Sequence, residues 1–506
     1  MLSTVKTTTL TGIEGVEVLV EVDIGSGLPT FTIVGLPAES VEESRERVRA
    51  AIKNSGFEFP IRKITVNLAP ADVKKEGTYF DLPIAVCILA ITDIIKDKNK
   101  IKEFYFLGEL SLDGSVRKVV GALPMVSSLP KGAKVIAPYD LIPEISIVED
   151  VDIYFVKHLK EVVEFLNGDR VIEPVKTDLS KVLETEISEE EDFSDIKGQY
   201  QAKRAIEIAV AGGHNLVMIG SPGSGKTLLA RRIPSIFPPL SKEESLEITK
   251  IYSVSNLLGS GVIKRRPFRS PHSSATLPSI IGGGNPIKPG EVSLAHNGVL
   301  FLDELPEFRR DVLESLRQPM EDGFVVVTRT KERIRFPSNF MLVAAMNPCP
   351  CGWFGDKEHA CTCSISDIKR YRNRVSGPIW DRFDIQIEVP RLLPGELVAD
   401  TKSESSKSVR ERVMRAREIQ TKRYLNTKIK NNASLTPRSI KTFIKLNHDE
   451  KVFLENASER LGLTGRGFDK ILKVARTIAD LEGSVDVRLP HIAEALQYRF
   501  DLSLNI

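Results

Sequence analysis

Residues 220–227 constrain the fold of this chain more than any other segment. Their sequence, GSPGSGKT, matches the pattern G-x-x-x-x-G-K-[ST]. The segment stands between an apolar run, HNLVMI, and a stretch of helical character, TLLARRI. In such a strand–loop–helix unit, glycines let backbone N–H groups wrap around phosphate oxygens. The pattern therefore predicts an α/β domain with a phosphate-binding loop made of Gly220, Ser221, Pro222, Gly223, Ser224, Gly225, Lys226 and Thr227.

Three polar side chains and two members of this loop form a candidate site for nucleotide chemistry. Lys226 is expected to reach the β- and γ-phosphates of ATP, and Thr227 to offer its hydroxyl to Mg²⁺. The apolar run GVLFLDEL ends in Asp303 and Glu304, and FMLVAAMNPCP ends near Asn347. Ligands of open α/β sheets bind at such strand ends. For each run, the alternative is that its polar residues merely end a strand and have no role in a site. Because both runs follow the loop in the chain, we favour a role in nucleotide chemistry.

The expected roles of these strand-end residues follow from their chemistry. Asp303 is a candidate ligand of Mg²⁺, through water, and Glu304 a candidate general base for the attacking water. The neutral amide of Asn347 can orient that water without repelling phosphate.

Two arginines are candidates for stabilising charge in the transition state. Arg382 lies in GPIWDRFD between acidic residues. It is either part of a surface salt-bridge cluster or a finger donated to a neighbouring subunit. Arg466 opens the helical segment TGRGFDKILKVARTIADLEG, from which it can close over the γ-phosphate. An ordinary surface arginine on a helix is the alternative for Arg466.

Charge and hydropathy limit the class of protein. The 506 residues include 70 Lys and Arg against 68 Asp and Glu, so the net charge of +2 excludes a globally basic nucleic-acid coat protein. The longest nearly apolar run, Leu82–Ile95, is shorter than a membrane span requires. The N-terminus, MLSTVKTTTLTG, has no apolar signal core. We therefore expect a cytoplasmic protein without a membrane partner.

The composition predicts four successive segments. Residues 1–167 are expected to form an α/β domain, with strands at Val16–Ile24, Thr30–Leu36 and in KITVNLAP, and with paired strands KVIAPYD and DIYFV. Helices are expected at Val41–Ser55, opened by Ser40, and at Leu82–Ala90. Residues 168–192 are expected to be an acidic linker and 193–390 the P-loop core. Residues 391–506 then form a basic helical segment and a C-terminal helical lid.

Four of the five cysteines crowd into fifteen residues: Cys349, Cys351, Cys361 and Cys363. Two close pairs of thiolates suit a tetrahedral Zn²⁺ site. Four reduced cysteines in a mobile loop are the alternative. The fifth, Cys87, lies in an apolar segment and is expected to be a core residue.

Together these motifs resemble those of AAA+ ATPases and, more closely, those of the Mg-chelatase-like YifB/ComM family. The matching strings cover nearly the whole chain and include PTFTIVGLP, FSDIKGQ, AGGHNLVMIGSPGSGKT, FRSPHSSAT, LFLDELPEF, MNPCPCG and KVARTIADLEG. The resemblance implies an ATP-driven ring, a hexamer, in which each site is completed by a neighbour's Arg382. It also implies helicase or branch-migration activity on single-stranded or branched DNA during uptake and recombination of foreign DNA.

The resemblance further implies two segments that face the pore of the ring. One is Ser279–Pro289, which carries Lys288, and the other is the hairpin Gly323–Phe336, whose tip carries Arg329, Lys331 and Arg333. Cations at a hairpin tip can track a phosphate backbone, although a solvated turn is the alternative. Residues 369–430 hold sixteen Lys or Arg against eight Asp or Glu. This stretch is either a solvated helix, a second nucleic-acid contact or a subunit interface.

The N-terminal α/β domain resembles the Lon protease domain without its catalytic dyad. The string KEGTYFD places Tyr79 where Lon has its nucleophilic serine, and Leu123 falls where Lon has its activating lysine. Without a base-activated nucleophile, covalent peptide hydrolysis has no route. The domain is therefore expected to bind or to gate. The alternative function for the whole chain is an ATPase that remodels a protein partner, such as a magnesium-chelatase-type metal-insertion enzyme.

Overall fold

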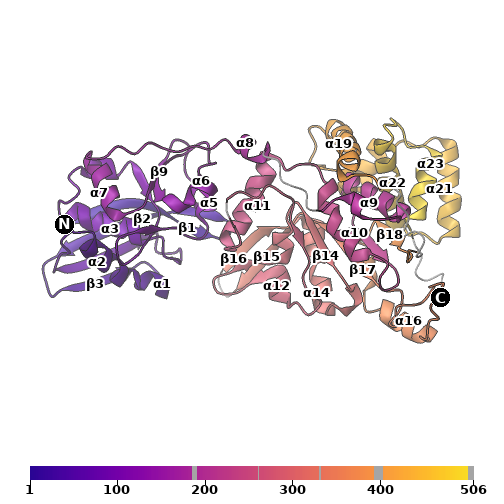
Figure 1. The fold of residues 1–506 in the computed structure, drawn as a ribbon, viewed down its shortest axis with the longest axis horizontal. Helices are drawn as coiled ribbons and strands as arrows, with labels where there is room; N and C mark the ends of the chain where they lie inside the picture. Colours follow the sequence, from indigo (N-terminus) through magenta and orange to yellow (C-terminus); the bar gives the residue numbers. More distant parts are fainter. Residues whose placement is uncertain (185–190, 260, 330–331, 393–402, 500–506) are drawn as a thin grey trace.

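The computed structural model describes residues 1–506 except 185–190, 260, 330–331, 393–402 and 500–506. An N-terminal α/β domain, a P-loop core and a group of C-terminal helices follow one another along the long axis (Figure 1). The expected multidomain α/β fold, with a parallel core sheet and a helical C-terminal region, is confirmed.

A seven-stranded mixed sheet organises the N-terminal domain, in the order β3-β4-β2-β1-β5-β8-β9. Strands β1 and β2 form a long antiparallel hairpin, whereas β8 and β9 pair in parallel, as the sequence predicts. The strand bounds are β1 (Leu2–Thr11), β2 (Glu14–Gly25), β3 (Thr30–Val34), β4 (Lys63–Ala69), β5 (Phe104–Phe106), β8 (Lys134–Pro138) and β9 (Asp152–Val156).

Helix α3 (Asp81–Ile91) is the centre of this domain, and all its residues are buried. A helix that is apolar all round must lie inside a core, which explains the run that the sequence shows. The helix expected over Val41–Ser55 is present as α2 (Ser44–Asn54), but its expected opening by Ser40 is wrong, because Ser40 lies inside a separate one-turn helix, α1 (Glu39–Glu42). Arg47 of α2 donates to the Ser40 carbonyl at 3.0 Å and to the buried Asp81 at 2.7 Å. An ion pair to α3, rather than a cap by Ser40, fixes this region.

Short elements complete the N-terminal domain. They are α4 (Lys98–Ile101), β6 (Glu109–Leu110), β7 (Val116–Arg117), α5 (Ala122–Ser127), α6 (Ile142–Ile145), α7 (Leu159–Asn167) and α8 (Leu179–Glu184). Leu179 of α8 is buried with the core of this domain, so part of the segment 168–192 packs against it.

Five parallel strands form the sheet of the P-loop core, in the order β11-β14-β17-β10-β18. Every residue of β10, β14 and β17 is buried, as is typical of parallel strands that helices cover on both faces. The strand bounds are β10 (Leu216–Ile219), β11 (Phe268–Arg269), β14 (Val299–Leu302), β17 (Met341–Met346) and β18 (Ile385–Glu388).

Helices and two small hairpins surround this sheet. The hairpins are β12 (Gly282–Gly283) with β13 (Lys288–Pro289), and β15 (Phe324–Arg329) with β16 (Glu332–Pro337). The helices are α9 (Tyr200–Gly212), α10 (Lys226–Arg232), α11 (Lys242–Val254), α12 (Leu277–Ile281), α13 (Glu291–Leu294), α14 (Arg310–Ser315), α15 (Arg317–Asp322), α16 (Ile365–Arg372) and α17 (Gly377–Trp380).

Helix α11 joins the core to the N-terminal domain (Figure 1). Leu246 of α11 and Val262 pack against the N-terminal core, and Ser253 donates to Glu144 at 2.6 Å. Burial raises the pKa of this carboxyl group. A second contact comes from the hairpin of β15 and β16, where Ile334 of β16 lies against Gly12 of the N-terminal domain. The two domains therefore contact each other through side chains rather than through the linker alone.

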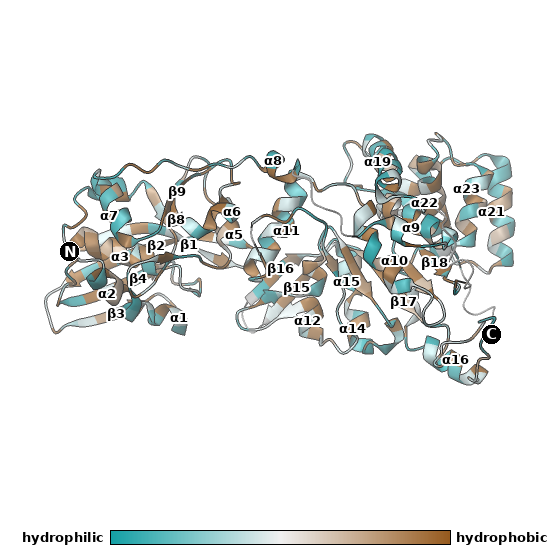
Figure 2. Cartoon of the chain, viewed as in Figure 1, coloured by the Kyte–Doolittle hydropathy of each residue, from teal (hydrophilic) through white to brown (hydrophobic). Residues whose placement is uncertain are grey.

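The C-terminal helices share one hydrophobic core with α9 and the core sheet. Helix α19 looks strongly hydrophilic in Figure 2, yet its arginines are engaged inside the protein. Arg410, Arg412, Arg417 and Arg423 bind, in turn, Ser235, Glu207, Val210 and Asp480. These four cations therefore fasten the helices to one another and to the core, rather than being solvated. The bounds are α19 (Ser406–Arg423), α20 (Pro437–Phe443), α21 (His448–Arg460), α22 (Gly465–Leu481) and α23 (Leu489–Gln497).

Among the helices that the structure describes, none combines the length and the apolar composition that crossing a membrane requires.

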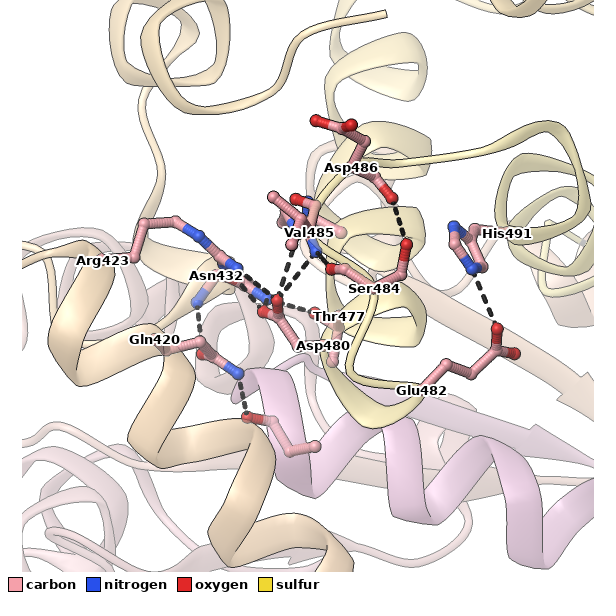
Figure 3. A network of polar contacts seen from close by, with 12 residues as sticks. Gln420, Arg423, Asn432, Thr477, Asp480, Glu482, Ser484, Val485, Asp486 and His491 are labelled. Carbon is pink, nitrogen blue, oxygen red and sulfur yellow. Dashed lines mark hydrogen bonds and ion pairs between the residues drawn. The ribbon is translucent and has the colours of Figure 1, made fainter.

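Asp480 is the centre of a buried polar network between α19 and α22 (Figure 3). Its carboxylate accepts hydrogen bonds from Arg423 at 2.9 Å, Asn432 at 2.8 Å and Arg476 at 3.2 Å. Arg476 continues the network to the Ser484 carbonyl at 2.6 Å. Buried charges are stable only when they are paired and hydrogen-bonded, and here each one is.

Replacing Asp480 with alanine should destabilise the C-terminal helices strongly. Arg423 and Arg476 would keep their buried charges without the carboxylate, which costs about 3–5 kcal/mol. Urea unfolding followed by circular dichroism measures the loss. The matched control is Glu482→Ala, which removes the exposed partner of His491, a bond of 2.9 Å in the same region. The control should change stability little, and an equal effect of both substitutions would contradict the role of Asp480.

Candidate nucleotide site

The loop between β10 and α10 has a backbone that requires its glycines. Gly223 and Gly225 adopt φ of 77° and 90°. A Cβ on Gly220 would lie 2.2 Å from the carbonyl oxygen of Val389, so the main chain directly after β18 leaves no room for a side chain. The loop opens directly into the N-terminus of α10, where backbone N–H groups and the helix dipole favour an anion. The loop therefore has the glycine conformations and the helix N-terminus that the sequence predicts, and its binding of phosphate stays a prediction.

Lys226 lies inside this loop. Its ammonium group donates to the carbonyls of Gly220 at 2.7 Å and Ser221 at 2.9 Å, and it lies 3.4 Å from the amide oxygen of Asn347. Burial lowers the pKa of Lys226 to about 8, against the attraction of Asp303. The ammonium group of Lys226 is thus already held inside the loop and is poorly solvated. The negative charge of an incoming phosphate would favour the charged form of this lysine.

Thr227 and Asp303 meet at the other side of the loop. The threonine hydroxyl donates to the carboxylate at 2.7 Å. A hydroxyl and a carboxylate are the oxygen ligands that Mg²⁺ takes in nucleotide sites, so these two residues fit a magnesium ion.

Glu304 follows Asp303 with a backbone that few residues adopt. Its φ is 54°, in the left-handed region, and its side chain is exposed. Such a conformation costs about 1–3 kcal/mol for a residue other than glycine, and it is found mostly at functional sites. The Asp303 carboxylate accepts the backbone N–H of Glu304 at 3.0 Å. The turn at Glu304 thus directs the two neighbouring carboxylates to different surroundings. Asp303 faces Thr227, while Glu304 stays available to solvent.

The two candidate arginines lie near each other at the opposite side of the core. Arg382 forms an ion pair with Glu321 of α15, and its Nε is buried without a hydrogen-bond partner among the described residues. Arg466 lies 3.9 Å from Asp381, the residue before Arg382, and its side chain is 72% exposed. The structure thus brings Lys226, Thr227, Asp303 and Asn347 together, and it brings Arg382 and Arg466 together in a second group.

Comparison with known proteins agrees with this geometry. Family profiles described as "Magnesium chelatase, subunit ChlI", "Subunit ChlI of Mg-chelatase" and "Magnesium chelatase, subunit ChlI C-terminal" match residues 192–397, 20–140 and 403–499. The competence protein ComM of Haemophilus influenzae is 46% identical over 494 residues, which are 96% of this chain and 95% of ComM. The protein YifB of Escherichia coli is 46% identical over 505 residues, 98% of this chain and 97% of YifB.

The chain belongs to the Mg-chelatase-like YifB/ComM family of AAA+ ATPases. Membership in this family implies ATP, Mg²⁺ and an oligomer. A further relative is the 67 kDa magnesium-chelatase subunit of Chlorobaculum tepidum, 30% identical over 162 residues. That match spans 31% of this chain and 23% of the relative.

The segments that the family resemblance assigns to a pore lie at the edge of the core. Lys288 is exposed on β13, and Arg333 is exposed on β16, where it pairs in register with Thr328. The side chain of Arg329 and all of Lys331 lie outside the described residues. The assignment of these cations to DNA stays a prediction.

The residues that replace the Lon dyad are buried in the N-terminal domain of this YifB/ComM chain. The Tyr79 hydroxyl bonds with that of Thr9 at 2.7 Å, and burial raises the pKa of Tyr79 to about 12. Leu123 is fully buried at the start of α5. A neutral, enclosed phenol and an apolar side chain offer no nucleophile and no base, so these two positions supply no hydrolytic chemistry.

Sequence reasoning missed two residues that hold the P-loop. Gln199, at φ 53° before α9, donates to the carbonyls of Ser224 at 3.2 Å and Pro390 at 2.7 Å. Asp356, in the loop between the cysteine pairs, accepts from the Ser221 hydroxyl at 2.7 Å. The string FSDIKGQ offered no clear signal for Gln199, since glutamine rarely adopts a positive φ. Nothing local in the sequence connects Asp356 to a loop more than a hundred residues earlier.

Nucleotide affinity should fall as the pH rises through about 8. Before nucleotide binds, Lys226 is charged below its pKa of about 8 and neutral above it. Phosphate raises this pKa, so binding at higher pH must take up a proton, and the Kd for ADP should increase by up to about tenfold per pH unit. Isothermal titration between about pH 7 and about 9.5 measures this slope. Lys226→Arg, whose guanidinium stays charged, should bind more weakly but without the slope, and equal slopes would exclude Lys226 as its source.

Proposed function

We propose that this chain is one subunit of an ATP-hydrolysing ring that moves along DNA. The contact of Lys226 with Asn347, together with that of Thr227 with Asp303, is the observation that supports ATP hydrolysis most directly. It unites a phosphate-binding cation, a pair of magnesium ligands and a water-orienting amide at the ends of three neighbouring strands.

In the proposed reaction the residues of one subunit prepare the phosphate and the water. The loop backbone and Lys226 bind the β- and γ-phosphates of ATP. Mg²⁺, when bound by Thr227 and Asp303, neutralises charge on the phosphate oxygens. Asn347 orients the attacking water, and Glu304 accepts its proton as the bond from the water oxygen to the γ-phosphorus forms. The bond between the γ-phosphorus and the β,γ-bridging oxygen breaks in the same step, so ADP leaves with that oxygen and the γ-phosphoryl group becomes inorganic phosphate. The solvent-exposed carboxylate of Glu304 then releases that proton to water.

The neighbouring subunit completes the site in this proposal. Arg382 and Arg466 lie together, and neither is among the contacts of the P-loop lysine of its own chain. The buried Nε of Arg382, which has no partner among the described residues, would gain one from an incoming phosphate oxygen. Both arginines therefore fit an interface role, and a closed ring of identical subunits, a hexamer, gives each P-loop such a neighbour.

Mixing two inactive variants should restore part of the activity. Arg382→Ala leaves its own P-loop intact, and Lys226→Ala leaves Arg382 intact, so a mixed ring contains some complete interfaces. We expect steady-state ATP hydrolysis by the mixture to exceed that of either variant alone. The control mixes Glu304→Gln with Lys226→Ala, because in that pair no P-loop has both lysine and base. Absence of rescue in the first mixture, or equal rescue in the control, would count against Arg382 acting on a neighbour.

The proposed substrate is single-stranded or branched DNA. Support comes from the exposed cations Lys288 and Arg333 on two hairpins of one edge, and from a relative whose name is "Competence protein ComM". Cations on hairpins can follow a phosphate backbone without reading its sequence. Helicase or branch migration during DNA uptake and recombination fits this chemistry. Such a role places the motor in the cytoplasm.

DNA should stimulate ATP hydrolysis, and added salt should remove the stimulation. Phosphate contacts release counterions, so their strength falls steeply with salt concentration. Hydrolysis is measured with no DNA and with single-stranded, duplex and branched DNA. Arg333→Ala should lose most of the stimulation and keep the basal rate, since the P-loop is intact. The matched control is Lys131→Ala. Lys131 is a cation of the N-terminal domain whose side chain is 84% exposed. Hydrolysis indifferent to every DNA would overturn the DNA proposal.

The alternative proposal is an ATPase that remodels a protein partner. The observation in its favour is the match of 162 residues to a magnesium-chelatase subunit of Chlorobaculum tepidum. In the same measurement, this function predicts hydrolysis that ignores DNA and rises with a protein partner instead.

A further inference from the structure

The four clustered cysteines form a compact set of sulfur atoms directly after the strand that carries Asn347. Their Sγ atoms all lie within 4.8 Å of one another. Cys349 is 3.4 Å from Cys351 and 3.7 Å from Cys361, and Cys351 is 3.5 Å from Cys361. The four are free thiols, one buried and three half-buried. The chain returns over a loop of nine residues to bring the two pairs together.

These separations agree with the edges of a metal–sulfur tetrahedron. Four sulfurs at about 2.3 Å from a Zn²⁺ ion lie about 3.8 Å from one another, whereas the sulfurs of a disulfide lie about 2.05 Å apart. Two backbone N–H groups also point at the sulfurs, from Phe354 to Cys349 at 3.3 Å and from Cys351 to Cys363 at 3.4 Å. Such donors stabilise thiolates, the form in which cysteine binds metal.

The loop that the cysteines close is in direct contact with the P-loop. Asp356, at its middle, accepts the hydrogen bond of Ser221 at 2.7 Å, and it also accepts the backbone N–H groups of Glu358 at 2.9 Å and His359 at 3.0 Å. At the start of the loop, a Cβ on Gly352 would lie 2.7 Å from the ring of Pro222, so the backbone of Gly352 lies against the side chain of Pro222. The cysteine loop therefore covers two residues of the phosphate-binding turn.

A polar loop of this kind has little to hold it in one conformation. Of its nine residues only Gly352 is buried, and the stacking of Trp353 on His359, with ring centroids 4.2 Å apart, is its main internal packing. Ordering such a loop costs conformational entropy that these few contacts do not offset, whereas a metal ion held by four side chains does.

We propose that Cys349, Cys351, Cys361 and Cys363 bind one Zn²⁺ ion, and that the loop closed by this ion positions the P-loop for nucleotide through Asp356 and Gly352. The ion is structural, since all four of its positions are taken by thiolates and none is open to a substrate. The second half of the inference rests on the proposed nucleotide function, and the first half does not.

The first experiment tests the metal site alone. Elemental analysis of the purified full chain should find about one zinc per chain, and replacement by Co²⁺ should give the visible absorption of tetrahedral cobalt–thiolate coordination. Cys361→Ser combined with Cys363→Ser should lose both signals. The control, Cys87→Ala, removes the buried cysteine of the N-terminal domain and should keep them. A wild-type chain that is soluble and binds ADP but contains no metal and no cobalt spectrum would overturn the site.

The second experiment tests the connection between the ion and the P-loop. Asp356→Ala should retain one zinc per chain while the Kd for ADP with Mg²⁺ rises by roughly tenfold, the order expected when a hydrogen bond to a charged group is lost. Glu358→Ala, on the same loop but half-exposed, should change neither quantity. Removing zinc from the wild-type chain with a chelator should weaken ADP binding to a similar degree.

The possible outcomes separate the two halves of the inference. Unchanged ADP affinity in both Asp356→Ala and the chelated protein would refute the coupling, even with zinc present. Lys226→Ala should lose ADP but keep its zinc. If the wild type binds zinc but no nucleotide at all, the proposed function fails and the metal site stands.

Discussion

The buried ammonium group of Lys226 is the interaction on which the site depends. It connects two carbonyls of the P-loop with Asn347, and Asn347 directly follows β17, the strand between β14 and β10. The parallel order of these strands brings Asp303 and Asn347 to the same edge as the loop. Because burial lowers the pKa of this lysine to about 8, it is better stabilised by phosphate than by its present partners. The same side chain therefore connects the P-loop to the neighbouring strand end and is placed to bind phosphate.

The C-terminal helices hold the second group of charges in place. Lys470 on α22 donates to the carbonyls of Asp381 and of Phe383, the latter at 3.0 Å. Arg466 lies one turn earlier on the same helix, beside Asp381. The segment with Arg382 is thus bound to α22 on both sides, so these contacts fix the position of that segment relative to α22. The buried network around Asp480 keeps α22 attached to α19 and through it to the core.

Most of the site was predictable because its signals are local. The P-loop, Asp303 and Asn347 stand in short strings whose strand, loop and helix context is readable, and the structure brings them together as expected. The roles of the arginines and of the exposed cations stay predictions. The ion pair of Arg47 with Asp81 was not predictable, because Asp81 lies on another element, 34 residues along the chain. The internal partners of the α19 arginines were missed for the same reason: their acceptors lie on other elements, 57 to 207 residues away.

The ion pair of Arg382 with Glu321 bears on how a ring of this protein can work. In the proposed ring, Arg382 would have to leave Glu321 to bind a neighbour's phosphate with more than the one hydrogen bond that its free Nε can give. The carboxylate of Glu321 is more than half exposed, so solvent screens its attraction for Arg382. A phosphate group also accepts charge-assisted hydrogen bonds from a guanidinium, and it carries more negative charge than the carboxylate. Glu321 also stands at the end of α15, directly before the hairpin that begins at Phe324. Exchange of Arg382 between Glu321 and phosphate would therefore link nucleotide in one subunit to the hairpin of the next.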